Sequence, residues 1–154
     1  FARESQGWPA RIPAAFPRFV DIYAEAGVHP SWGRIDDADG ATFDRTLAAA
    51  LALRPRFVQI ATWNDWGEGT MIEPSVEIGI RDLEAVQRTR RTLTPGFAPT
   101  KEHLGLPGDL LARRRATTDA GVQSRLDAVA TLIGRLEPAA AADALRALGP
   151  APQP

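Results

Sequence analysis

Residues 56–75, RFVQIATWNDWGEGTMIEPS, decide the fold and contain most of the chemically active side chains. The first part, Arg56–Trp63, is short and almost continuously apolar, which predicts a strand covered on both faces, as in a parallel sheet. The second part, Asn64–Ser75, fits no regular period and contains two glycines and three carboxylates. We therefore expect an irregular loop that leaves the carboxyl end of a buried strand.

The sequence before this stretch supplies a second strand and a helix. Phe16–Tyr23 alternates apolar and polar residues, which predicts a strand, and Gly27–Gly40 is rich in turn residues, which predicts a long loop. A helix is expected over Phe43–Leu53, with Thr42 as its cap. Its buried face would consist of three residues at helical spacing: Phe43, Leu47 and Ala50.

A further helix is expected after the loop, over Ile80–Leu93. Its inner face would hold Ile80, Leu83, Val86 and the stem of Arg90. Residues 16–93 thus have the order strand, loop, helix, strand, loop, helix, which is typical of an α/β fold with a parallel sheet.

The sequence changes character after this helix. We expect a first domain over residues 1–95, a linker over residues 96–108, an α-helical hairpin over residues 109–150 and a disordered tail over residues 151–154. Within the hairpin, Asp119–Leu136 has apolar residues at helical spacing (Val122, Leu126, Val129, Ile133 and Leu136), with Thr118 or Asp119 as cap. A shorter helix over Leu110–Arg115 precedes it, and Ala139–Leu148 completes it.

Composition excludes several classes of function. The chain has 154 residues, 18 basic and 19 acidic side chains and no cysteine. A net charge of −1 gives no electrostatic basis for binding nucleic acid or an anionic membrane, and no apolar stretch is long enough to span a bilayer. Two histidines and no thiolate predict no metal site and no cofactor, and the acidic run at Asp36, Asp37 and Asp39 does not have the spacing of a calcium loop.

The loop after Trp63 has the equipment for chemistry on sugars. Aromatic faces beside carboxylates suit a sugar ring, and two carboxylates near one bond are the minimum for glycoside cleavage. Asp65 and Glu68 would point to opposite faces of a straight strand, but Gly67 lets the chain bend, so that both can face one pocket. The alternative is that these acidic residues are solvated or cap a helix.

The run TWNDWGEGTMIEPS resembles the signature of the glycoside hydrolase family 71/99-like (β/α)8 barrels, as does the upstream run around Gly33, Arg34, Asp36, Asp39 and Gly40. The resemblance covers roughly residues 16–93, so it implies an α/β fold made of the C-terminal βα units of a TIM-type barrel. A closed barrel needs about 200 to 250 residues, which implies that the missing strands lie upstream or in a partner chain.

The same resemblance implies roles for the carboxylates. Glu68 would correspond to the general acid/base, and Asp65 to the carboxylate that assists attack by the substrate's own 2-hydroxyl. The sequence departs from the family at two positions, because the first carboxylate there is usually Glu and Gly67 stands where those enzymes often carry His.

Further residues are candidates for binding the substrate: Trp63, Asn64, Trp66, Glu73, His29, Trp32, Arg34 and Tyr23. Glu73 could bind sugar or support Arg34, whereas His29 could equally be a solvated loop residue and Tyr23 a packing residue. No metal ligand is assigned.

Two hypotheses about function follow. The chain is part of a glycosidase that acts on an α-linked glycan (α-mannan or α-glucan) through Asp65 and Glu68, or part of a non-catalytic carbohydrate-binding or polysaccharide-biosynthesis barrel that has lost turnover. The partners expected are an oligo- or polysaccharide and the missing N-terminal part of the same barrel, with no nucleic acid and no membrane. A third option is that the helical hairpin mediates protein association.

Overall fold

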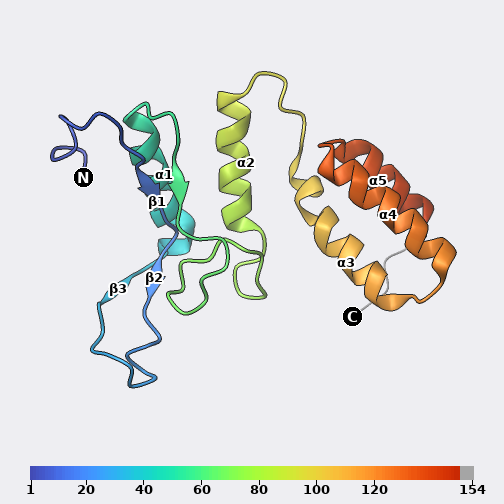
Figure 1. Ribbon diagram of the computed structural model, residues 1–154, viewed down its shortest axis with the longest axis horizontal. Coiled ribbons are helices and arrows are strands. Elements are labelled where there is room, and N and C mark those ends of the chain that lie inside the picture. Colours follow the sequence, from blue (N-terminus) through green and yellow to red (C-terminus); the bar gives the residue numbers. More distant parts are fainter. Residues whose placement is uncertain (150–154) are drawn as a thin grey trace. The chain divides into compact units, whose positions relative to one another are not determined.

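The computed structural model describes residues 1–149 (Figure 1). The chain forms two compact units, Phe1–Ala85 and Val86–Pro154, and the division falls inside helix α2 (Arg81–Leu93). The tail expected over residues 151–154 lies outside the described residues. Through residue 149, no helix combines the length and the apolar character needed to cross a bilayer.

The first unit is built on a parallel βαβ element. Strand β1 (Ala14–Ala15) pairs in parallel with β4 (Gln59–Ile60), and helix α1 (Ala41–Ala52) lies between them in sequence and packs on β1. The predicted buried face of α1 is confirmed, since Phe43, Leu47 and Ala50 are all buried. The α/β class with a parallel strand pair is therefore observed.

The predicted cap of α1 is wrong. The helix begins one residue before Thr42, and Gly40 precedes it in the left-handed conformation with φ of 89°. Thr42 lies within the first turn, where its hydroxyl donates to the carbonyl of Asp36 at 2.7 Å. A short 3-10 helix, η1 (Ala38–Gly40), leads into α1 and occupies the end of the expected loop.

The single strand expected over Phe16–Tyr23 is also wrong. The segment contains only β2 (Phe19–Val20), which pairs antiparallel with β3 (Arg34–Ile35), and β1 lies before it. Neighbouring backbone groups have other partners, because the N–H and carbonyl of Phe16 both bond to the hydroxyl of Thr46, at 3.1 and 2.7 Å. The amide of Ile22 donates to the loop around Gly67 rather than to a strand.

The strand expected over Arg56–Trp63 is shorter and less covered than predicted. Only Gln59 and Ile60 are strand residues, neither is buried, and Phe57 is 63% exposed. Within the described residues β4 has one pairing partner, β1, so one edge of β4 is left unpaired.

Helix α2 matches the predicted span, but its buried face differs from the prediction. Asp82, Ala85 and Gln87 are buried, whereas Arg90 is exposed with its guanidinium 5.3 Å from the centre of the Phe97 ring. The apolar stripe fails as a guide here because an ion pair of Asp82, described below, anchors the start of the helix.

The second unit is helical. It contains the 3-10 helix η2 (Lys101–Gly105) and helices α3 (Leu106–Ala116), α4 (Ala120–Gly134) and α5 (Pro138–Ala147). The region expected to be a linker thus contains η2 and the start of α3. The buried core is formed by Leu106, Leu126, Val129, Ala141 and Leu145.

The start of α4 matches the prediction, and its end does not. Asp119 caps the helix by accepting from the amide of Val122 at 2.8 Å, as expected. Leu136 does not join the core: it is 79% exposed, because α4 ends at Gly134 and Leu136 lies in the turn beyond it with φ of 60°.

Candidate functional site

The loop after β4 is closed at its base by hydrogen bonds between its two ends. The amide of Thr62 donates to the carbonyl of Thr70 at 3.0 Å, and the amide of Ile72 donates to the carbonyl of Thr62 at 3.0 Å. The hydroxyls of Thr62 and Thr70 lie 2.9 Å apart and hydrogen bond to each other. Residues 63–69 are therefore presented as one loop at the carboxyl end of β4, where enzymes with parallel sheets place their active sites.

Asp65 folds the tip of this loop. Its amide donates to the hydroxyl of Thr62 at 3.1 Å, and its Oδ1 accepts from the amide of Glu68 at 3.0 Å. The Asp65 carboxylate is half-buried, and one of its oxygens is committed to the backbone of the turn. This is the helix-cap type of contact that the structural alternative predicted for an acidic residue here.

The Glu68 carboxylate has a different environment. Glu68 is half-buried, and among the residues that the structure describes its carboxylate makes no hydrogen bond or ion pair. The backbone of Glu68 is fixed at both ends, because its amide donates to Asp65 and its carbonyl accepts from the amide of Val20 at 2.8 Å. A held backbone with an uncommitted acid is suited to proton transfer with a ligand.

Two different features of the structure require glycine at positions 67 and 69 of the loop. Gly69 has the left-handed φ of 64° that L side chains rarely adopt. Gly67 is required by a close approach, since a Cβ there would lie 2.5 Å from the hydroxyl oxygen of Tyr23. We predicted that Gly67 would let the chain bend; the residue with the left-handed backbone conformation is instead Gly69.

Tyr23, His29 and Trp32 form one aromatic cluster beside this loop. The His29 and Trp32 rings stack with centres 4.3 Å apart and planes 15° apart, and the Tyr23 and His29 rings lie 5.8 Å apart. The amide of Ile22 donates to the carbonyl of Gly67 at 3.2 Å, which ties the cluster's segment to the loop. The structure therefore brings these three predicted residues together and brings Tyr23 to the turn between Asp65 and Glu68.

Asp21 organises this cluster, and the sequence analysis missed it. Its buried carboxylate accepts from the amides of Tyr23 at 2.9 Å and Trp32 at 3.2 Å, and the Nδ1 of His29 lies 3.7 Å away. The available signal was a single acidic residue inside the apolar run FVDIY, at a position where a strand would expose it.

The two indoles of the loop are exposed, as sugar stacking would require. Trp63 is 52% and Trp66 47% exposed, and the Nε1 of Trp66 donates to Oε2 of Glu73 at 3.2 Å. Asn64 is exposed, and its carbonyl accepts from the amide of Trp66 at 3.1 Å. Glu73 thus orients an indole.

Arg34 pairs elsewhere. Its exposed guanidinium lies 3.7 Å from Asp36, so the expected support from Glu73 is not observed. The arginine that does support the loop is Arg18, which is buried and donates to the carbonyl of Met71 at 2.9 Å.

Arg18 belongs to a network of ion pairs behind the loop. It pairs with the buried carboxylate of Asp82 and lies 3.8 Å from Asp37, and Arg81 pairs with Asp37 at 2.7 Å and Asp39 at 3.2 Å. The hydrogen bond from Arg81 is the largest cause that holds the pKa of Asp37 below its ordinary value. Of the acidic run, Asp37 and Asp39 therefore serve this network. Residues 1–149 contain no group of three or more acidic or histidine side chains able to hold a metal ion.

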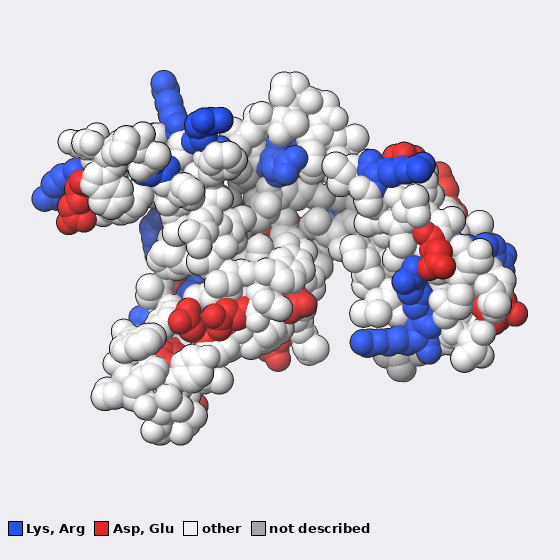
Figure 2. Space-filling model, viewed as in Figure 1, with Lys and Arg blue, Asp and Glu red and all other residues white. Residues whose placement is uncertain are grey.

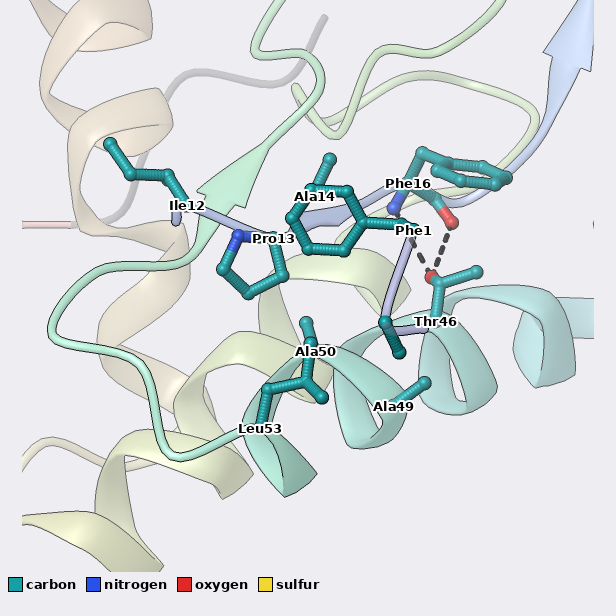
Figure 3. A pocket seen from close by; sticks show the side chains of 10 residues that line it. Phe1, Ile12, Pro13, Ala14, Phe16, Thr46, Ala49, Ala50 and Leu53 are labelled. Carbon is teal, nitrogen blue, oxygen red and sulfur yellow. Dashed lines mark hydrogen bonds between the residues drawn. The ribbon is translucent and has the colours of Figure 1, made fainter. Parts of the chain in front are cut away.

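An apolar cavity lies away from the loop. A cavity of about 420 Å³ is lined by Phe1, Ile12, Pro13, Phe16 and Leu53, among others, and Figure 3 shows the Thr46 hydroxyl that bonds to Phe16 beside it. None of its lining residues comes from the loop after β4.

On the face drawn in Figure 2, Lys and Arg are spread in separate small groups.

Comparison with known proteins finds similarity to endo-alpha-mannosidase-like proteins. No family model matches the chain. Over 66 residues, or 42% of the chain, it is 35% identical to the glycoprotein endo-alpha-1,2-mannosidase-like protein of Mus musculus, 33% identical to that of Homo sapiens and 32% identical to that of Danio rerio. The match spans 14% of the length of each of these relatives. In sequence, the chain is therefore similar to endo-alpha-1,2-mannosidase-like proteins over less than half of its length.

Two solved structures were also matched, both of the family 99 endo-alpha-mannosidase from Bacteroides thetaiotaomicron, one of them in complex with bis-tris propane. The TM-scores are 0.45 and 0.46, the sequence identities are 21% and 23%, and 60% of this chain is covered in both cases. The matches cover 35% and 33% of those chains.

Proposed function

We propose that this chain carries the acid-bearing loop of a glycoside hydrolase that acts on an α-linked glycan, an α-mannan or α-glucan. The sequence similarity to endo-alpha-1,2-mannosidase-like proteins supports the class of substrate. The uncommitted, half-buried Glu68 carboxylate on a loop with a fixed base carries the proposal of catalysis.

In this proposal Glu68 is the acid that protonates the leaving oxygen of the glycosidic bond. Asp65 accepts the proton of the substrate's 2-hydroxyl as that hydroxyl attacks the anomeric carbon. Its Oδ1 bond to the Glu68 amide holds both residues in one turn and leaves its second oxygen to accept that proton. The exposed Trp63 and Trp66 rings supply faces on which a sugar can stack, and Asn64 and Glu73 lie on the same loop.

We further propose that the first unit is the C-terminal part of a (β/α)8 barrel. The parallel β1–α1–β4 element and its loop at the carboxyl end of β4 have the arrangement that such a barrel repeats. The unpaired edge of β4 and the exposed Phe57 would be covered by strands and helices from the remainder of the protein. Hydrogen exchange on the full-length protein tests this: the outward edge of β4 should be protected there, and rapid exchange would contradict the barrel.

The test of catalysis is Glu68→Gln in the full-length protein, assayed on α-mannan and α-glucan. Gln keeps the size of the side chain but cannot donate the proton, so we expect turnover to fall by a factor of about 100 or more. Glu77→Gln, the same change at an exposed position nine residues further on, is the matched control and should keep full turnover. Activity that survives Glu68→Gln would reject this assignment.

One observation favours a second candidate, a carbohydrate-binding barrel without turnover. The Asp65 carboxylate already serves the backbone of its turn, which a purely structural aspartate would also do. In that case the wild-type protein binds α-linked oligosaccharides but releases no shorter sugars, and Glu68→Gln leaves the affinity within about twofold. Hydrolysis by the wild type would exclude this candidate.

A further inference from the structure

Tyr23 reaches into the turn that carries the two acids. A Cβ on Gly67 would lie 2.5 Å from the Tyr23 hydroxyl oxygen, 2.9 Å from Cζ and 3.3 Å from Cε2. Carbon atoms of side chains do not approach an oxygen to 2.5 Å without displacing it. The end of the phenol therefore occupies the space that a side chain at position 67 would fill.

The backbone on both sides of this contact is fixed. The amide of Tyr23 donates to Oδ1 of the buried Asp21 at 2.9 Å, and its carbonyl accepts from the amide of Val28 at 2.9 Å. On the other side of the contact, the carbonyl of Gly67 accepts from the amide of Ile22 at 3.2 Å. A side chain added at position 67 could be accommodated only if the phenol ring turned away.

The Tyr23 hydroxyl has the properties of a ligand-binding group. Tyr23 is 39% exposed, and within residues 1–149 its hydroxyl has no hydrogen-bond partner. A phenol hydroxyl both donates and accepts, as sugar hydroxyls do, and it carries no charge that would compete with the carboxylates. The His29 ring lies beside the phenol, with the ring centres 5.8 Å apart.

We propose that Tyr23 is a specificity-determining residue of the sugar site, in which its hydroxyl replaces a side chain at position 67 and hydrogen bonds to the neutral sugar bound at the Asp65–Glu68 turn. This inference rests on the proposed carbohydrate function. It adds that the glycine at position 67 is required by the tyrosine at position 23, so that a side chain at position 67 needs a smaller residue at position 23.

The steric part of this proposal is tested by a double-mutant cycle in stability. Gly67→Ala should lower the urea midpoint, Tyr23→Ala should make room for the new methyl group, and the double variant should lose less than the two single effects combined. Gly7→Ala is the matched control, because a Cβ at Gly7 meets no atom within 4 Å. Additive effects of Gly67→Ala and Tyr23→Ala would overturn the proposal.

The binding part is tested by calorimetry on the full-length protein with α-linked mannobiose and α-linked glucobiose. Tyr23→Phe keeps the ring and removes only the hydroxyl, so we expect the Kd for the preferred disaccharide to rise about fivefold, the value of one neutral hydrogen bond. Tyr23→Ala combined with Gly67→Ser returns a hydroxyl from the other side of the contact and should recover part of the affinity. In an active protein, Tyr23→Phe should raise KM and leave kcat within about twofold.

The outcomes separate this inference from the proposed function. If the wild type binds a disaccharide and Trp66→Ala weakens that binding while Tyr23→Phe does not, the site is a sugar site and the role of Tyr23 is rejected. If the wild type binds neither disaccharide, the carbohydrate function and the role of Tyr23 are both rejected. A fivefold loss in Tyr23→Phe with partial recovery by Gly67→Ser in the Tyr23→Ala background supports both.

Discussion

Asp65 has two separable tasks, and two substitutions distinguish them. Its Oδ1 accepts the Glu68 amide at 3.0 Å, which is a structural contact, and its negative charge is the property that catalysis would use. Asp65→Asn keeps an oxygen in the place of Oδ1 and removes the charge. Asp65→Ala removes both the oxygen and the charge.

The structure sets the expected size of each effect. Losing a side-chain acceptor to a backbone N–H in such a turn costs about 1 to 2 kcal/mol of unfolding free energy, whereas Asn and Asp are about equally good at a capping position. Asp65→Ala should therefore be the less stable variant by about 1 kcal/mol. Both variants should lose turnover by a factor of about 100 to 10,000, since neither can accept a proton.

Urea unfolding followed by tryptophan fluorescence measures the stability difference in the relevant unit. All four tryptophans, at positions 8, 32, 63 and 66, lie within Phe1–Ala85, so their emission does not report on the helical unit. Turnover is measured on α-mannan and α-glucan with the full-length protein. Equal stability of the two variants would refute the structural role of the Oδ1 bond, and full turnover in Asp65→Asn would refute the catalytic role of the charge.

Three further results are expected. Asp82→Asn leaves the buried Arg18 without its closest counter-charge, and should cost about 3 to 5 kcal/mol in the urea unfolding of the first unit; a cost below about 1 kcal/mol would mean that the pair is not needed. Arg81 holds the pKa of Asp37 below the ordinary value of 3.8, so the Asp37 carboxylate stabilises the fold fully above pH 3.8. This contribution disappears as the pH falls below 3.8 through the lowered pKa. Asp37→Asn should therefore reduce the acid sensitivity of the urea midpoint, and an unchanged pH profile would contradict this. Leu126→Ala should destabilise the helical unit by about 2 to 5 kcal/mol, so that the helix signal in far-UV circular dichroism is lost at a lower temperature than in the wild type. The urea midpoint of tryptophan emission should not change, because the tryptophans lie in the first unit. Loss of both signals together would show that the units do not unfold separately.

Helical periodicity predicted the elements of this chain best. The face of α1 and the cap of α4 at Asp119 follow from the spacing of a few neighbouring residues, because a helix satisfies its backbone groups within itself. The strands were predicted less well, since a strand is defined by partners elsewhere in the chain. Nothing in the letters of Phe16–Tyr23 shows that Thr46 takes the backbone groups of Phe16.

The residues of the candidate site could be grouped from sequence where they are adjacent in the chain. The loop from Trp63 to Glu73 is one short run, so its acids and indoles were found together. Asp21 was missed, since its partners at Tyr23 and Trp32 become visible only once residues 21–33 fold back on themselves. Arg18 was missed for a similar reason, because its buried partner Asp82 is 64 residues away.

The two glycines of the loop show why sequence alone cannot assign a cause to a residue. Gly67 and Gly69 look equivalent in WGEG, yet Gly69 is required by its own backbone angle and Gly67 by the side chain of another segment. A φ of 64° penalises any ordinary side chain at Gly69 whatever surrounds it, and Val20 lies against the same position with its Cβ 3.1 Å away. The requirement at Gly67 instead exists only as long as Tyr23 does, so a change at position 23 would release position 67 to carry a side chain. The shape of this site can therefore vary through residues 23 and 67 together while Asp65, Glu68 and Gly69 keep the turn itself unchanged.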